Sequence, residues 1–165
     1  MKNQVIHIHE KTLQDLEFQT VLQQVSELCV TALGNEKALQ ITPYKTKDEL
    51  QSALKLVNEY LSSYYNDNRI PNHGFDAITK ELKLLRIENT YLEVHGLKKI
   101  VSISITANDI VTYLRKFEEY YPSLNHFAFH IEVTKILIEK VDAIVDRFGD
   151  IKDNASPLLS QLRQS

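Results

Sequence analysis

The stretch LEVHGLKKIVSISITANDIVTYL, residues 92–114, decides the fold class. Its apolar residues recur every three or four positions, the spacing that places side chains on one face of an α-helix. The positions on this face are Leu97, Ile100, Val101, Ser104, Ile105, Asn108, Val111 and Leu114. The β-branched run from Val101 to Thr106 has low intrinsic helix propensity, so we expect packing to hold the helix together. The stretch therefore predicts a long amphipathic helix.

The same spacing predicts a helical corner nearer the amino terminus. Apolar residues recur with helical period over 16–32 and predict the first helix. Gly34 is expected to end this helix in a left-handed conformation, and Asn35 to cap a short helix over 36–41. This part of the chain is thus predicted to contain two helices joined at a glycine.

Capping signals and turn residues place the remaining bundle helices. Two capping boxes, Thr46–Glu49 and Thr90–Glu93, predict the starts of the second helix and of the long helix. Between them a turn-rich loop over 66–74 is followed by a third helix from about Asp76. A final bundle helix is expected through 136–144, with its first turns around residues 125–132.

Near the carboxyl terminus the sequence predicts a turn and one more helix. Gly149 is expected at the left-handed position of a short hairpin near 144–152, and Val5–Ile8 alternates weakly as a second minor β-segment. Ser156 as cap and Pro157 at the first helical position predict a helix start. The expected fold class is all-α, an irregular helical bundle with at most the short β-hairpin.

The composition is that of an ordinary globular protein. Of the 165 residues, 43% are hydrophobic and 25% charged, and there are four Gly and four Pro. A chain of this length can bury enough surface for one domain. Because phosphate-binding surfaces gather Lys and Arg, the net charge of −3 predicts that any DNA contact is local or lies elsewhere.

Cysteine usage and hydropathy predict a soluble, cytoplasmic protein. Cys29 is the single cysteine, lies on the apolar stripe of the predicted 16–32 helix, and is expected to be a reduced, buried thiol. The first ten residues lack the apolar region of a signal peptide. Polar and charged residues interrupt 92–114 too often for a transmembrane span.

Histidine spacing suggests two candidate metal sites, each with a simpler interpretation. His126 and His130 would share a helix face near Glu132, but the glutamate that follows the first histidine in metalloproteases is absent. We interpret both as half-exposed histidines. His7 and His9 would point to one side of a strand, without a third ligand nearby.

Three aspartates gather around the predicted glycine turn. Asp146, Asp150 and Asp153 lack the alternating ligands and final glutamate of a calcium loop, so we interpret them as turn and cap residues. The glycines at 34, 74, 96 and 149 stand alone, which excludes a phosphate-binding loop. Cys29 has no paired base in the sequence. We therefore predict no catalytic, cofactor-binding or metal-binding residue and no enzyme activity for this chain.

Aromatic and basic residues are the candidates for contact with nucleic acid. The pairs Tyr64–Tyr65 and Tyr120–Tyr121 have acidic neighbours, which favours packing at helix ends over base stacking. The best basic candidates are Lys80, Lys83, Arg86, Lys98 and Lys99. Glutamates intersperse them, as on an ordinary solvated helix face.

Three stretches resemble one branch of the MutS family. They are KTLQDLEF with TALGNEKAL within 11–39, IPNHGFDAI at 70–78, and DRFGDIKDNASPLL at 146–159. This bacterial branch lacks the amino-terminal mismatch-reading domain and typically carries a carboxy-terminal Smr nuclease module. The third stretch is the most specific, because in the family such a glycine turn and Ala-Ser-Pro cap precede a long lever helix.

The resemblance implies that the chain is part of a longer protein. It places residues 1–155 in the amino-terminal part of a helical core domain and residues 156–165 at the start of the lever helix. The parent would be an ATPase using ATP and Mg, in part of the family also an endonuclease, acting in mismatch repair or suppression of recombination. Its partners would be DNA, the clamp and ATPase domain of the same chain, and a second copy in a homodimer, with no membrane.

The resemblance leaves the role of the chain open between two hypotheses. In the first, the chain is a mechanical core that couples the DNA clamp to the ATPase dimer. In the second, it is an independent helical module that binds a partner protein. A third possibility concerns the parent, which in some relatives acts on stalled ribosomes.

Overall fold

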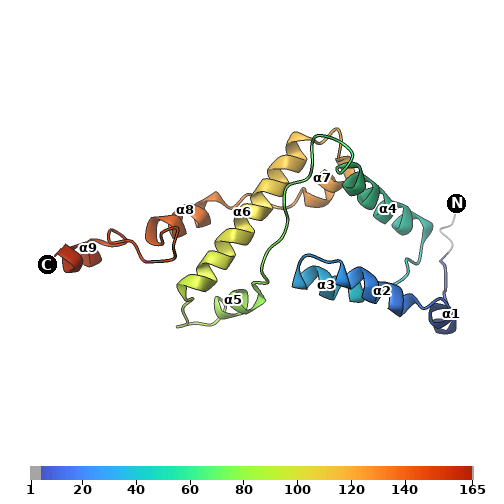
Figure 1. The fold of residues 1–165 in the computed structure, drawn as a ribbon, viewed down its shortest axis with the longest axis horizontal. Helices are drawn as coiled ribbons and strands as arrows, with labels where there is room; N and C mark the ends of the chain where they lie inside the picture. Colours follow the sequence, from blue (N-terminus) through green and yellow to red (C-terminus); the bar gives the residue numbers. More distant parts are fainter. Residues whose placement is uncertain (1–4, 165) are drawn as a thin grey trace. The chain divides into compact units, whose positions relative to one another are not determined.

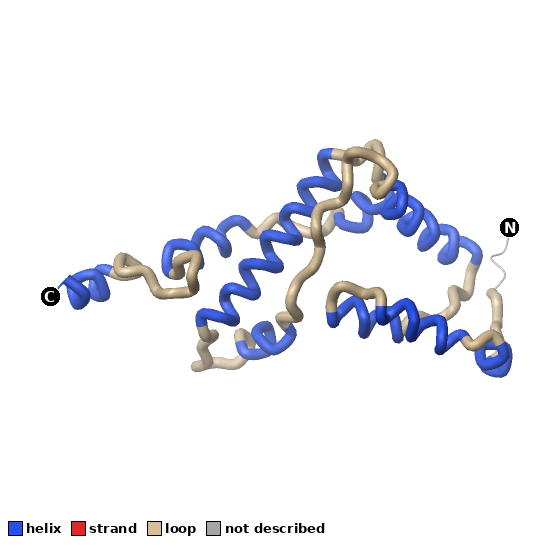
Figure 2. Tube along the Cα trace, viewed as in Figure 1, coloured by secondary structure: helices blue, strands red, loops and turns tan. Residues whose placement is uncertain are grey.

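The computed structural model describes residues 5–164, and these form helices and loops without a strand (Figures 1 and 2). The all-α prediction is therefore confirmed for this range. The helices are α1 (Glu10–Asp15), α2 (Phe18–Glu27), α3 (Ala32–Leu39), α4 (Lys47–Ser62), α5 (Thr79–Leu84), α6 (Val94–Lys116), α7 (Pro122–Ala128), α8 (Lys135–Ile144) and α9 (Pro157–Gln164).

The chain divides into two compact units. Unit 1 comprises the described part of Met1–Ile70 together with Tyr113–His130, and unit 2 comprises Pro71–Thr112 together with the described part of Ile131–Ser165. Helix α6 contributes its last turn to unit 1 and the rest to unit 2. The predicted division at residue 155 concerns a longer protein and stays a prediction.

The first helices of unit 1 differ from the predicted 16–32 helix. Glu17 adopts a left-handed conformation with φ 51° and separates α1 from α2. Helix α2 ends at Glu27, and α3 begins after Thr31, whose hydroxyl accepts the N–H of Gly34 at 3.0 Å. The continuous helix was therefore a wrong prediction, because a side-chain cap starts a new helix within the apolar stripe.

Gly34 has a different role from the one predicted. It lies inside α3 rather than ending a helix, and among the described glycines only Gly149 has positive φ. A Cβ on Gly34 would lie 3.0 Å from the Thr31 hydroxyl oxygen, so glycine permits the cap to approach. Asn35 is not a cap either, since its amide donates to the Ser26 carbonyl at 3.1 Å and joins α3 to α2.

Helix α4 begins as predicted. The Thr46 hydroxyl accepts the Glu49 N–H at 3.2 Å, and the Glu49 carboxylate accepts the Thr46 N–H at 3.0 Å, which completes the capping box. At its other end α4 packs against α7, as Figure 1 shows. The Glu59 carboxylate accepts the N–H groups of Ser123 at 3.0 Å and Leu124 at 2.8 Å. A carboxylate from one helix thereby caps the amino terminus of another.

The predicted final bundle helix is two helices. Residues 129–134 interrupt it between α7 and α8. Thr134, just before α8, donates its N–H to the Asn108 side chain at 2.9 Å. This side-chain contact with α6 satisfies a backbone donor that a continuous helix would have used internally.

Tyr121 is the most buried large side chain of unit 1. It is 0% exposed, and its hydroxyl lies 2.8 Å from the Asn68 carbonyl and 3.0 Å from the Asn66 amide nitrogen. The Tyr113 hydroxyl donates to the same Asn68 carbonyl, and burial raises its pKa. Tyr121 thus packs at a helix end as predicted, whereas Tyr65, at 90% exposure, does not.

In unit 2 the long helix is confirmed and its predicted cap is not. Helix α6 includes the β-branched run and begins at Val94. The Thr90 hydroxyl lies 2.6 Å from the Leu84 carbonyl and 2.8 Å from the Ile87 carbonyl. It therefore closes the end of α5 instead of starting α6. Helix α5 itself begins at Thr79 rather than at Asp76.

The two expected β-segments are smaller than predicted. One antiparallel bridge joins Val145 to Ile151, which is what remains of the hairpin near 144–152. Val5–Ile8 forms no strand, although the Ile6 N–H donates to the Lys45 carbonyl at 2.7 Å. Within residues 5–164, none of the helices combines the length and apolar character that a bilayer span requires.

Candidate binding pocket

The turn that follows α8 is held by one carboxylate. The Asp146 Oδ1 accepts the N–H groups of Phe148 at 2.9 Å, Gly149 at 2.8 Å and Asp150 at 2.8 Å. Gly149 has φ 98°, the left-handed conformation predicted for it. The N–H of Asp150 is the main cause that lowers the pKa of Asp146, and the other two amides and the Lys98 charge act in the same direction against desolvation.

Two lysines donate to backbone carbonyls on either side of this turn. The Lys98 ammonium, from α6, lies 3.3 Å from the Arg147 carbonyl. A Cβ on Gly149 would lie 3.4 Å from both Cδ and Nζ of Lys98, so the lysine crosses close to the glycine. The Lys152 ammonium donates to the Asp142 carbonyl in the last turn of α8. A cation placed at the carboxyl end of a helix complements the partial negative charge there.

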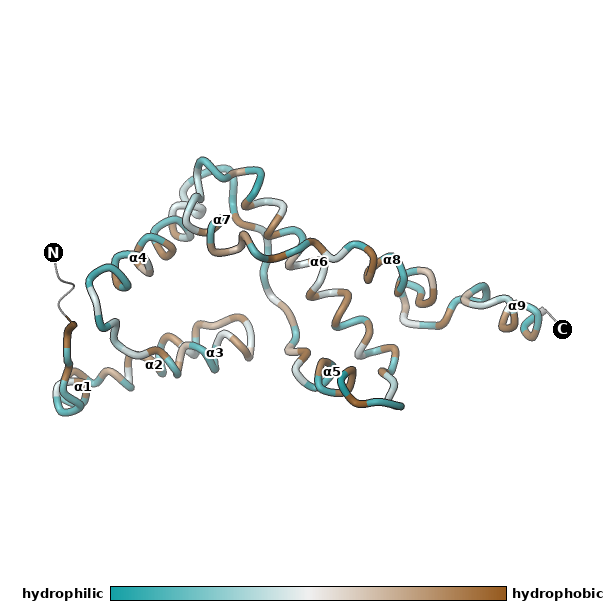
Figure 3. Tube along the Cα trace, turned by 180° about the vertical axis from the view of Figure 1, so that it is seen from behind, coloured by the Kyte–Doolittle hydropathy of each residue, from teal (hydrophilic) through white to brown (hydrophobic). Residues whose placement is uncertain are grey.

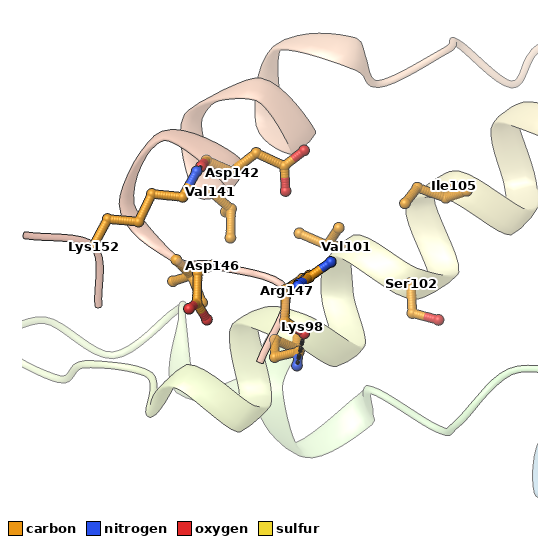
Figure 4. Close-up of a pocket in the computed structure, with 10 residues that line it drawn as sticks. Lys98, Val101, Ser102, Ile105, Val141, Asp142, Asp146, Arg147 and Lys152 are labelled. Atoms are coloured by element: carbon orange, nitrogen blue, oxygen red, sulfur yellow. Dashed lines mark hydrogen bonds between the residues drawn. The ribbon is translucent and has the colours of Figure 1, made fainter. Parts of the chain in front are cut away.

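These residues surround an open pocket of about 520 Å³ between α6 and α8, shown in Figure 4. Its apolar lining comes from Val101 and Ile105 on α6 and from Val141 and Val145 at α8. Val145 is only 5% exposed, whereas Ile105 is 43% exposed. The floor is thus apolar and partly open to solvent.

The rim of the pocket is charged. Lys98, Arg147 and Lys152 are cations, and Asp142 and Asp146 are anions, which leaves an excess of one positive charge. The Arg147 guanidinium lies 4.6 Å from the centroid of the Phe148 ring. Figure 4 shows the Lys98 ammonium near the backbone of Arg147, and Lys152 beside Asp142. In a chain of net charge −3 this is a local basic site.

The five residues of the predicted basic face do not line one site, and Lys83 and Arg86 line neither of the two pockets that the other three line. Lys98 lines this pocket, whereas Lys80 and Lys99 line a second pocket of about 390 Å³ beside α5. There Lys99 lies 3.8 Å from the Glu81 carboxylate, whose Oε2 is buried without a hydrogen-bond partner. A Cβ on Gly96 would lie 3.2 Å from Glu81 Cγ. An internal ion pair therefore forms part of the lining of this second pocket.

The candidate metal ligands do not come together. His126 is in α7 while His130 lies beyond its end, and both are exposed rather than half-exposed. His7 and His9 are also exposed. In the described range no group of three or more histidine, cysteine or acidic side chains could hold a metal ion.

Cys29 is half-buried rather than buried as predicted. Helix α2 ends two residues before it, so the cysteine leaves the apolar stripe. Its sulfur lies 3.4 Å from the Val25 carbonyl oxygen.

Sequence comparison identifies known proteins that are similar to this chain. No family model matches the chain. Endonuclease MutS2 from Alkaliphilus oremlandii is 24% identical over 159 residues, which are 95% of this chain and 20% of that protein. The MutS2 endonucleases from Caldanaerobacter subterraneus subsp. tengcongensis and Geobacillus sp. are each 27% identical, over 161 and 160 residues. This chain is similar to endonuclease MutS2.

The resemblance predicted from three motifs is confirmed by this similarity, which extends along almost the whole chain. The chain spans about a fifth of the length of the curated MutS2 relatives it matches. The turn around Gly149, which was the most specific motif, is also the turn that bounds the pocket in Figure 4.

Proposed function

We propose that this chain is a helical framework of a MutS2-like protein, in which it couples a DNA-binding part to an ATP-hydrolysing dimer. The observation that carries the proposal is the apolar surface that the described helices leave uncovered. The proposal is also supported by the similarity of this chain to proteins named endonuclease MutS2, in which the matching part is about one fifth of the length. ATP, Mg, DNA and a second subunit would be bound by other parts of that protein.

Helix α4 shows the uncovered surface most clearly. None of its residues is buried, and Leu54 and Val57 are 50% and 52% exposed. Leu50 and Leu61 share the same face and are 42% and 48% exposed. Figure 3 shows apolar and polar residues alternating along α4, as expected of an amphipathic helix. Because these side chains are already about half covered, covering the rest of each would contribute about 1 kcal/mol, so this face is suited to pack against another segment.

Unit 2 also exposes large apolar side chains to solvent. Ile136 in α8 is 69% exposed, and Leu158 and Leu162 in α9 are 67% and 65% exposed. Large apolar side chains this exposed are candidates for burial against another surface. The proposal therefore gives these faces a structural partner in the longer protein.

Helix α6 supplies a means of coupling. It runs for 23 residues, which at 1.5 Å per residue is roughly 35 Å. A continuous hydrogen-bonded helix carries a displacement from one end to the other, and two sites that each favour one arrangement of such helices bias one another. Coupling by packed elements requires no pocket in the framework itself.

The test compares two proteins. One is the 165-residue chain, and the other is the proposed longer MutS2-like protein that contains it. The variant carries Leu54→Asp and Val57→Asp, and its control is Asn58→Asp on the same helix. We expect the double variant to lower the free energy of unfolding of the longer protein by about 2–5 kcal/mol, because charges would enter a covered apolar face. In the chain alone the loss should be smaller, about 1 kcal/mol, because both side chains are already half exposed.

A second readout separates coupling from mere packing. In the longer protein, the double variant should lose the stimulation of ATP hydrolysis by DNA at temperatures where it remains folded. Equal, small effects on both proteins would show that the α4 face is open in each. That result would reject the framework and favour the independent interaction module.

A further inference from the structure

We propose that the pocket between α6 and α8 docks a short acidic and apolar segment of a separate partner protein. Such a segment would place an apolar side chain on the valine and isoleucine floor and its carboxylates on the cations of the rim. This proposal does not rest on the framework function, because it concerns a site that lies entirely within unit 2.

The cations of the rim are held in position before anything binds. Lys98 and Lys152 each donate to a backbone carbonyl, and an ammonium has three donors, so each retains donors for a ligand. The planar guanidinium of Arg147 rests on the Phe148 ring and offers the paired N–H geometry that fits a carboxylate. Fixed donors reduce the entropy that docking must overcome.

The anions of the rim decide which ligand fits. Asp146 already accepts three backbone N–H groups through Oδ1, so its position cannot change without opening the turn. Together with Asp142 it would repel a continuous polyanion such as a nucleic-acid backbone, which cannot place its charges selectively. A peptide can place one carboxylate near Lys98 or Arg147 and an apolar side chain over Val101.

The size of the pocket favours a separate partner over a permanent internal contact. A volume of about 520 Å³ holds only a few side chains. Its charged rim resembles the polar rim of a transient interface, whereas the α4 face is continuous and apolar as in permanent packing.

The experiment uses a fluorescein-labelled peptide of about ten residues in which leucine and aspartate alternate. Anisotropy is measured with the 165-residue chain and with the longer protein. We expect binding to both, weakening as salt is raised. It should be lost when the leucines of the peptide are replaced by serine or its aspartates by lysine.

Matched variants locate the binding. Arg147→Glu with Lys152→Glu should weaken binding about tenfold, because each reversal turns an attraction into a repulsion. The control pair Lys135→Glu with Lys140→Glu makes the same charge change on α8 outside the pocket lining and should leave binding within about twofold. Ile105→Ser tests the floor without a charge change and should also weaken binding severalfold.

Several outcomes would overturn the proposal. They are absence of binding up to about 1 mM chain, equal weakening by both charge-reversal pairs, and no effect of Ile105→Ser. Binding to the chain but not to the longer protein would show that an internal segment fills the pocket. Tighter, pocket-dependent binding of a DNA oligonucleotide, or self-association of the chain abolished by the Arg147 and Lys152 reversals, would assign the site to a different occupant.

Discussion

At the residue scale, the turn after α8 depends on two features of the sequence, the missing Cβ of Gly149 and the Oδ1 of Asp146. The glycine adopts φ 98°, and any side chain there would meet Lys98. The carboxylate gathers the N–H groups of the three residues at 148–150, so backbone donors are satisfied without a ladder of β-sheet bonds.

Gly149→Ala should destabilise the chain by about 1–2 kcal/mol, because an L side chain is strained at this φ. Urea unfolding followed by circular dichroism measures the change. Gly74→Ala is the control, since its Cβ would meet only the Asn72 side-chain oxygen at 3.5 Å. If Gly149→Ala lowers the free energy of unfolding no more than Gly74→Ala does, the turn does not require the left-handed backbone conformation at residue 149.

Stability should also depend on Asp146 at acid pH. Its pKa is lowered from 3.8 in the folded chain, so near and below pH 3.8 the unfolded chain binds the proton more readily. The contribution of Asp146 is therefore present above that pH and is lost as pH falls through the lower folded value. Asp146→Asn should flatten this part of the curve of unfolding free energy against pH. An unchanged acid slope in the variant would contradict the assignment.

At the element scale, α7 is a short helix that another helix holds in place. It has 7 residues and Pro122 at its start, and it lacks a side-chain cap from its own N-cap residue Tyr121. Glu59 of α4 supplies the acceptor for two of its free N–H groups. Isolated helices of this length are not stable in water, so α7 depends on α4.

Glu59→Ala should cost about 1 kcal/mol, as the loss of an N-terminal cap does. Hydrogen exchange should speed up at the first amides of α7, with Ser123 and Leu124 the most affected. Glu118→Ala removes an exposed carboxylate of unit 1 and serves as the control, with an effect within about 0.5 kcal/mol. Equal protection of α7 in the two variants would exclude the cap.

At the scale of the whole molecule, exposed apolar residues and basic residues lie in different places. Exposed apolar side chains lie on α4, α8 and α9. The basic residues of unit 2 do not gather in one place: Lys98, Arg147 and Lys152 line one pocket, Lys80 and Lys99 line another, and the rest line neither. Such a surface does not form the basic stripe that tracks a phosphate backbone.

The chain alone is therefore expected to bind four-way-junction, mismatched or single-stranded DNA no more tightly than the non-specific range of about 10⁻⁴–10⁻⁶ M at physiological salt. Fluorescence anisotropy across a salt series measures this. Nanomolar, salt-sensitive binding would contradict the prediction. In that case charge reversal at Lys80 and Lys83 should be tested first.

The features that could be predicted from the sequence depend on interactions between residues close together in the chain. The period of three and four over 92–114, the capping box at Thr46 and the turn at Gly149 each depend on residues within a few positions of one another. The three MutS2-like motifs are likewise contiguous, so the similarity to MutS2 follows from the sequence alone. The pocket itself was not predicted, since Asp146 and Gly149 were expected in a turn but not beside Lys98.

Only the tertiary structure decided contacts between residues far apart in the chain. The Glu59 cap joins positions 64 and 65 residues apart, Tyr121 reaches Asn68 across 53, and Lys98 reaches Arg147 across 49. Local competition also decided the break at Thr31, whose hydroxyl accepts the Gly34 N–H, and the contacts of the Thr90 hydroxyl, which lies close to two carbonyl acceptors. Apolar period and capping chemistry depend on neighbouring residues. Packing instead brings together residues that are distant in the sequence, and those contacts become visible only in the folded chain.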